Sequence, residues 1–291
     1  MTMKAWRLDR LGGDLRLENV PMPEVRPGSI LVRVEASTLM SYIKPYVEGR
    51  LPPYHAPSSG FTPAGNCVGT IEAAGKDVWQ LAPGQRVLVS SLFRSSENVA
   101  DPAQILIGVT SFGPDSEKVQ ADWPDGTLAE YVLLPASSVV PADGFEDMEA
   151  TQLAAVSRFV IPYGGLVRGR LAAGETLIVN GATGAYGSAA VFVARAMGAG
   201  RVVAAGRNAD KLDVLVRWRA IPHVAALMRA TCLEEAGGYC RRQPHAEDDQ
   251  NEVAEGAEAA QSFRLRTAKA VGDDAIHQKA NRQGDQKDEQ H

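Results

Sequence analysis

Short apolar segments, separated by proline and glycine, fill the first 140 residues of the chain. The clearest is residues 29–35, which is rich in β-branched side chains and therefore predicts a strand. Further strands are predicted at residues 4–8, 15–18, 66–75, 81–89 and 126–135. Many short strands joined by Pro/Gly turns are typical of a small barrel-like β domain.

The pattern changes beyond residue 145, where residues 146–158 show helical spacing of apolar side chains. The apolar run 176–179 then predicts a buried strand. Residues 188–197 predict a helix that ends at Gly198, and residues 202–205 predict the next strand. A strand, a glycine turn, a helix and a second strand form the first half of a dinucleotide-binding fold.

The glycine turn between that strand and helix carries the candidate cofactor site. Its sequence is Ala182, Thr183, Gly184, Ala185, Tyr186 and Gly187, the variant A-x-G-x-x-G. Gly184 would let the backbone approach a pyrophosphate, and Gly187 would let the helix pack close to the strand. The N–H groups at the helix start would bind the phosphate charge. The alternative is a purely structural glycine turn.

The end of the second strand indicates which nicotinamide cofactor is used. NAD-dependent proteins place an acid there to bind the ribose 2′-hydroxyl, but this chain has Gly206, Arg207 and Asn208. Arg207 can pair with a 2′-phosphate through charge-assisted hydrogen bonds, and Lys211 is a second candidate. NADPH is therefore expected in preference to NADH. The alternative is that Arg207 is a solvated residue at a helix start.

Composition excludes several other classes of protein. The chain has 291 residues, and its net charge of −5 does not favour nucleic-acid binding. Its three cysteines, Cys67, Cys232 and Cys240, form neither a disulfide framework nor a metal site. No signal peptide or membrane-spanning run is recognisable, so a soluble protein in the cytoplasm is expected.

Several motifs in order resemble the medium-chain dehydrogenase/reductase superfamily, the alcohol dehydrogenase and quinone oxidoreductase group. They are Pro27-Gly28, Gly69 with Gly75, Pro83-Gly84 with Val87, Gly126 with Ala129-Glu130-Tyr131, and Gly174-Glu175. The resemblance implies an α/β protein with a GroES-like β-barrel domain at residues 1–145. A partial Rossmann domain, a doubly wound parallel sheet, would follow at residues 146–220, and a low-order tail at residues 221–291. It also implies a homodimer.

The chain departs from the zinc-using members of that family. Such members carry Gly-His-Glu where this chain has Ala64, Gly65 and Asn66. Their first catalytic cysteine falls in the segment that corresponds to residues 37–42 of this chain, which contains no cysteine. The four-cysteine structural zinc loop is also absent from the sequence. The resemblance therefore points to the zinc-less branch, with no metal bound.

Without zinc, hydrogen bonds must stabilise the developing charge, which favours hydride transfer to an enone, quinone or related carbonyl. Tyr42 and Tyr46 are the predicted catalytic hydrogen-bond donors, and Lys44 would supply positive charge. Ser157 and Tyr163 precede the glycine strand, where similar proteins contact the nicotinamide. The alternatives are that the tyrosines only pack, or that the substrate is an unknown alcohol.

The family pattern is lost in the sequence after about residue 216. Residues 222–235 predict one helix, and the polar segment from residue 241 onward is expected to be disordered or loosely helical. Either the reading frame was lost after residue 216, or the tail binds a partner. The chain would then be an inactive fragment, a weak nucleotide binder or an interaction module.

Overall fold

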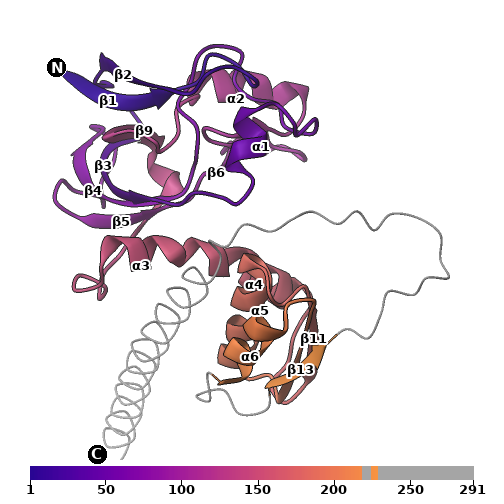
Figure 1. The fold of residues 1–291 in the computed structure, drawn as a ribbon. Helices are drawn as coiled ribbons and strands as arrows, with labels where there is room; N and C mark the ends of the chain where they lie inside the picture. Colours follow the sequence, from indigo (N-terminus) through magenta and orange to yellow (C-terminus); the bar gives the residue numbers. More distant parts are fainter. Residues whose placement is uncertain (218–223, 229–291) are drawn as a thin grey trace, which may run out of the picture. The chain divides into compact units, whose positions relative to one another are not determined.

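The computed structural model describes residues 1–217 and 224–228 and divides the chain into two units (Figure 1). The first unit is Met1–Ser157, and the second begins at Arg158. The predicted disorder of the tail lies outside the described residues. Within the described part of the chain, no helix has both the length and the apolar character needed to cross a membrane.

The first unit is built mainly from antiparallel strands. A five-stranded sheet has the order β10-β5-β4-β3-β9, a three-stranded sheet the order β6-β7-β8, and β1 pairs with β2. The strands are β1 (Thr2–Arg7), β2 (Arg16–Pro21), β3 (Ser29–Ser37), β4 (Cys67–Ala74), β5 (Arg86–Val89), β6 (Leu92–Arg94), β7 (Gln104–Leu106), β8 (Thr110–Ser111), β9 (Tyr131–Pro135) and β10 (Val139–Pro141). The described strands form separate open sheets, not one closed barrel.

Short helices complete the first unit. They are α1 (Ile43–Val47), α2 (Glu117–Asp122) and α3 (Ala150–Ala155), with 3₁₀ turns η1 (Pro114–Ser116) and η2 (Ala136–Ser138). Helix α3 contacts β3 and β4, and its Leu153 and Ala154 are buried together with Val68 of β4. The helix that was predicted over residues 146–158 is therefore confirmed as a shorter one, and its end is held against the sheet.

Strand β3 lies inside the five-stranded sheet because its first half is apolar on both faces. Its residues Ser29–Val32 are all buried, and β4 and β9 flank it in antiparallel register. Ile30 and Val32 pack with Ile71 of β4 and Leu134 of β9 in the largest core cluster. Each fully buried aliphatic side chain contributes about 1.5–3 kcal/mol, so this sheet forms the stable framework of the unit.

The second unit is a three-stranded parallel sheet with helices. The strands have the order β11-β12-β13, with Thr176 opposite Arg201 and Val202 opposite Val224. The elements are α4 (Ser157–Arg168), β11 (Thr176–Asn180), α5 (Ala185–Ala196), β12 (Arg201–Gly206), α6 (Ala209–Arg217) and β13 (Val224–Met228). Val179, Val191, Val202 and Leu212 are buried in one cluster, so α5 and α6 each cover the sheet with an apolar face.

Strand β13 corrects the prediction of a helix over residues 222–235. Val224–Met228 pairs in parallel with β12, so the structural pattern of the fold extends past residue 216. A five-residue apolar run does not distinguish a strand from part of a buried helix, and pairing with β12 decides in favour of the strand. The rest of the predicted helix, residues 229–235, lies outside the described residues.

Candidate functional site

The glycine turn closes tightly between β11 and α5. Gly181 has a φ of +72°, the left-handed conformation that glycine adopts without strain. A Cβ atom on Gly187 would lie 2.0 Å from the Gly181 carbonyl oxygen, whereas one on Gly184 would meet nothing nearer than 3.5 Å. Gly181 and Gly187 are therefore required by the fold. Gly184 is exposed, and its missing side chain leaves open space.

The predicted cofactor residues of the turn lie beside the end of β12. The Ala182 N–H donates to the Ala205 carbonyl over 3.0 Å, and a Cβ atom on Gly206 would lie 2.7 Å from Thr183 Cγ2. Ala182 is buried, while Gly184 and Ala185 are exposed where α5 begins. An exposed helix start with adjacent backbone N–H groups suits an anionic group.

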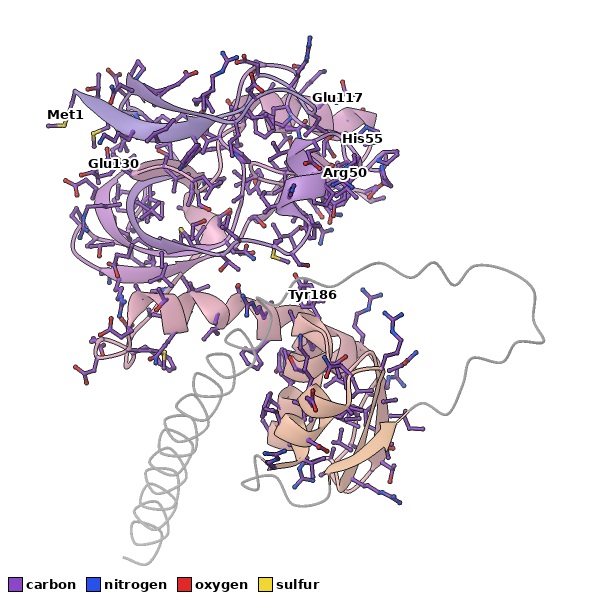
Figure 2. All side chains as sticks on the ribbon, in the orientation of Figure 1. Met1, Arg50, His55, Glu117, Glu130 and Tyr186 are labelled. Carbon is purple, nitrogen blue, oxygen red and sulfur yellow. The ribbon has the colours of Figure 1, made fainter. Side chains whose placement is uncertain are left out.

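The residues after β12 have separate roles. The Asn208 side chain accepts a 3.0 Å hydrogen bond from the Lys211 N–H and so caps α6. Arg207 is exposed, and Lys211 is half-buried. The Tyr186 side chain lies at the start of α5 (Figure 2). The structure thus brings residues 182–187 together with Gly206 and Arg207 at one end of the sheet.

The predicted catalytic tyrosines lie in different surroundings around α1. Tyr46 is 1% exposed, and its hydroxyl donates to the Val109 carbonyl over 2.6 Å. Burial raises the pKa of Tyr46 well above the ordinary value for a tyrosine, and the nearby Tyr42 and Tyr54 raise it further. Tyr42 is half-buried with its ring 5.6 Å from that of Tyr54, and Lys44 is exposed. Their catalytic roles remain predictions, and the geometry favours Tyr42 over Tyr46.

Sequence reasoning missed a pair of hydroxyls where β3 meets the end of α3. Thr38 Oγ1 donates to the Ala154 carbonyl over 3.1 Å, and Ser157 Oγ donates to the same carbonyl over 2.9 Å. The two hydroxyl oxygens are 3.3 Å apart, although 119 residues separate them in the chain. We call Thr38 and Ser157 the hydroxyl pair. The resemblance had placed Ser157 near the nicotinamide and Thr38 in the segment aligned with a catalytic cysteine, but nothing in the sequence indicated that the two hydroxyls meet.

The segment that replaces Gly-His-Glu lies next to the hydroxyl pair. The Thr38 N–H donates to the Asn66 carbonyl over 2.9 Å, and the Ser91 N–H donates to Asn66 Oδ1 over 2.8 Å. A Cβ atom on Gly65 would lie 2.2 Å from Ser91 Cβ. Hence an imidazole has no room at residue 65 in this conformation, and the Asn66 amide is already used in holding the loop.

The cysteine that follows Asn66 is buried. Burial, and to a lesser extent Glu35, raises the pKa of the Cys67 thiol to about 12. Nowhere in residues 1–217 and 224–228 do three His, Cys, Asp or Glu side chains gather as a potential metal site. Ser37 is also engaged, because its hydroxyl is 2.7 Å from that of Thr127.

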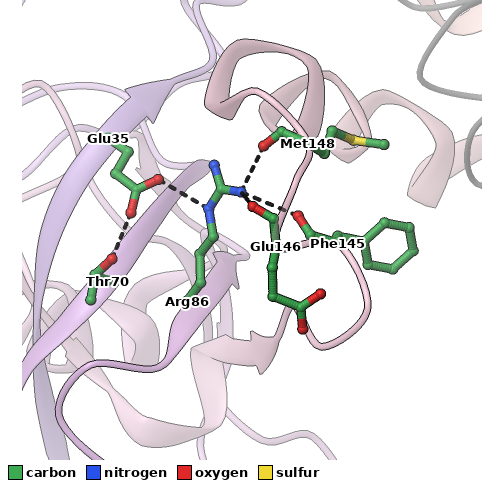
Figure 3. Close-up of polar contacts among 6 residues, drawn as sticks. All are labelled: Glu35, Thr70, Arg86, Phe145, Glu146 and Met148. Atoms are coloured by element: carbon green, nitrogen blue, oxygen red, sulfur yellow. Dashed lines mark hydrogen bonds and ion pairs between the residues drawn. The ribbon is translucent and has the colours of Figure 1, made fainter.

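An arginine network fixes the chain that leads into α3 (Figure 3). Arg86 Nε donates to Glu35 over 3.0 Å, and Arg86 also donates to the carbonyls of Phe145, Glu146 and Met148. Glu35 accepts a second hydrogen bond, of 2.5 Å, from Thr70. One guanidinium therefore ties β3 and β5 to the loop before α3, and this fixes where Ala154 and Ser157 lie relative to Thr38.

The comparisons with known proteins agree with this architecture. The alcohol dehydrogenase GroES-like domain matches residues 26–144. An alcohol dehydrogenase of Rhizobium meliloti is 31% identical over 245 residues, 79% of this chain and 68% of that protein. One of a Moraxella species is 30% identical over 213 residues, 72% of this chain and 60% of that protein. The chain belongs to the medium-chain dehydrogenase/reductase superfamily, as its motifs predicted.

A solved structure supports the same fold. A Sinorhizobium meliloti protein described as a zinc-binding dehydrogenase bound to NADP aligns with a TM-score of 0.59 and 22% identity, over 78% of this chain and 62% of that one. The chain spans 57–60% of the length of the first curated relatives that it matches.

Proposed function

We propose that this chain is an NADPH-dependent oxidoreductase that transfers a hydride to an enone, quinone or related carbonyl without zinc. The observation that carries the proposal is the glycine turn, where the Ala182 N–H bonds to β12 and Gly184 and Ala185 leave the start of α5 open. This arrangement suits a dinucleotide pyrophosphate. NADPH would supply the hydride, and the protein would supply orientation and charge stabilisation.

The proposed preference for NADPH rests on the charge near the end of β12. Arg207 is exposed immediately after Gly206, and no carboxylate stands between Gly206 and Ala209 to repel a 2′-phosphate. The NADP-bound relative supports a nicotinamide cofactor in this fold. The residues proposed to hold the cofactor are 182–187, Gly206, Arg207, Asn208 and Lys211.

The proposal of zinc-free chemistry rests on the side chains that replace the ligands. Gly65 has no side chain, the Asn66 amide holds Ser91, and the Thr38 hydroxyl holds Ala154. Hydride addition to a conjugated carbonyl places charge on an oxygen that hydrogen bonds alone can stabilise. Oxidation of a simple alcohol would instead require a group that lowers the pKa of the alcohol.

The domain limits 1–145, 146–220 and 221–291, the cytoplasmic location and the homodimer also stand as proposals. The location rests on composition, and the dimer rests on resemblance alone. The proposed partner is a small carbonyl compound, an enone or a quinone.

The cofactor assignment is tested by comparing two exposed arginines, Arg207 directly after β12 and Arg201 at the first residue of β12. Arg207→Ser should weaken NADPH binding by roughly 10–100-fold, because charge-assisted hydrogen bonds contribute about 1.5–3 kcal/mol, and should leave NADH binding unchanged. Arg201→Ser, the matched control, should change neither affinity. Fluorescence titration of the full chain measures both. Equal losses for the two variants would contradict the proposed 2′-phosphate contact.

Turnover is tested with NADPH and a panel of enones and quinones, and separately with NADP⁺ and a panel of alcohols. Both reactions are followed by the absorbance of the reduced nicotinamide at about 340 nm. Consumption of NADPH with an enone or quinone supports the proposal. NADPH binding without turnover on any substrate would support the alternative, a protein that binds the nucleotide without catalysis.

A further inference from the structure

Strand β11 is an edge strand of the three-stranded parallel sheet. In the described part of the chain it pairs with β12 alone. The Arg201 N–H of β12 donates to the carbonyl of Glu175, the residue directly before β11, over 3.2 Å. Along a strand, alternate residues direct their N–H and C=O groups to the same side. The backbone groups of Thr176, Ile178 and Asn180 therefore point away from β12, and we call this side of β11 the open edge.

The side chain of Ile178 lies on the face of the sheet opposite the helices. Helices α5 and α6 cover the face that carries Val179 and Val202 (Figure 1). Successive side chains of a strand point to opposite faces, and Ile178 is accordingly 67% exposed. Parallel sheets are normally covered on both faces. The middle residue of the open edge is thus an aliphatic side chain that an added strand would partly bury.

Several other edge strands carry residues that prevent the addition of a strand. Strand β2 contains Arg16, Glu18 and Pro21, while β9 ends at Pro135 and β10 ends at Pro141. Charged side chains and prolines protect the edges of sheets in this way. Strand β11, with the sequence Thr-Leu-Ile-Val-Asn, contains neither. Its open edge can therefore accept another strand.

The residues of the open edge are complementary to themselves. When two β11 strands pair antiparallel about a two-fold axis at Ile178, Thr176 of each copy lies opposite Asn180 of the other. The two Ile178 side chains then meet at the centre, between two polar pairs that can form hydrogen bonds. Strand β13, at the other edge of the sheet, also lacks charges and prolines, but it is Val-Ala-Ala-Leu-Met and has no polar residue to define such a register.

We propose that a second copy of this chain pairs antiparallel with β11 through the open edge, so that the two parallel sheets join into one continuous sheet. The N–H and C=O groups of the two Ile178 residues would exchange a pair of hydrogen bonds at its centre. The inference depends neither on the proposed function nor on the family resemblance. Two five-residue strands bury less than the roughly 800 Å² per partner of a stable interface. We therefore expect a reversible dimer, populated at roughly 10–100 µM chain.

Sedimentation of the full chain at increasing concentration tests the proposal. Ile178→Lys places two like charges opposite each other on the axis and removes the apolar pair, so it should raise the dimer dissociation constant by roughly 10-fold or more. Ile178→Glu should do the same. A mixture of the two variants places Lys opposite Glu and should form a heterodimer. The matched control is Val140→Lys, at a 59% exposed residue of the edge strand β10, which should leave the dissociation constant unchanged.

The mixture also separates a specific contact from a loss of stability, because two variants that are merely misfolded cannot restore each other. If Ile178→Lys does not fold, Ile178→Thr keeps a β-branched side chain and should still weaken the dimer. A wild type that stays a monomer up to roughly 100 µM overturns the inference. It is also overturned by a dimer whose dissociation constant is the same in the wild type and in both Ile178 variants, since that dimer uses another surface.

Discussion

Ala64 is a residue in a conformation that glycine normally adopts. Its φ is +69°, and it is 5% exposed. The left-handed conformation of an alanine costs about 1–2 kcal/mol, and a glycine at this position would remove that cost. A glycine would also destabilise the fold by about 1–2 kcal/mol, because it makes the unfolded chain more flexible and removes a buried methyl group. Ala64→Gly should therefore leave the free energy of unfolding nearly unchanged.

The control for this prediction is Ala142→Gly. Ala142 is also buried, at 2% exposure, and is not among the residues with positive φ. Ala142→Gly makes the unfolded chain more flexible and removes a buried methyl group without relieving any backbone strain. It should therefore lower the free energy of unfolding by about 1–2 kcal/mol. Urea unfolding of both variants measures the difference. Equal destabilisation at the two positions would show that the Ala64 backbone is not strained.

The Ala64 conformation matters because of what lies beside it. Its carbonyl accepts a hydrogen bond from the Thr127 N–H, and Gly65 and Asn66 follow it directly. Residues in rarely populated conformations tend to occur where the surrounding structure must hold a functional group in place. Here the held group is the Asn66 carbonyl, which accepts from the Thr38 N–H and so fixes one member of the hydroxyl pair.

At the scale of elements, the junction of β11 with α5 separates two kinds of glycine. A Cβ at Gly187 would lie 2.0 Å from the Gly181 carbonyl oxygen, so Gly187→Ala must push the helix from the strand and should cost about 1–3 kcal/mol. Gly184→Ala, with no contact under 3.5 Å, should keep the stability and weaken NADPH binding. Urea unfolding and NADPH titration measure the two effects. A Gly184→Ala variant that binds NADPH like the wild type would argue against a pyrophosphate at this turn.

The same junction shows what the sequence could predict. Residues 176–206 were predictable because strand, glycine turn and helix are each encoded locally. The largest difference is the start of α5, which lies at Ala185 instead of residue 188, and the other bounds differ by one residue at most. Strand β13 was not predictable, because Val224–Met228 becomes a strand through pairing with β12. Local apolar runs carry no information about that partner.

The residues of the candidate site also differ in whether the sequence could predict them. The cofactor turn lies within one short segment, so its residues could be named from spacing alone. The hydroxyl pair could not, because Thr38 and Ser157 are 119 residues apart and meet only when α3 packs on the sheet. The tyrosines of α1 were selected by residue type, which does not reveal that the Tyr46 hydroxyl is bonded to Val109.

At the scale of the whole molecule, the two units should respond differently to the cofactor. NADPH at about 100 times its Kd should stabilise the folded state that binds it by about 2.7 kcal/mol, which slows hydrogen exchange through unfolding of that unit by about 100-fold. The slowing should appear in β11, α5 and β12, which surround the glycine turn, and be absent from the β1–β2 pair of the first unit. Exchange followed by mass spectrometry, with and without NADPH, measures this. Equal slowing of exchange in both units would contradict binding of the cofactor at the glycine turn. If exchange slows in neither unit, NADPH does not bind this chain and the proposed hydride donor is wrong.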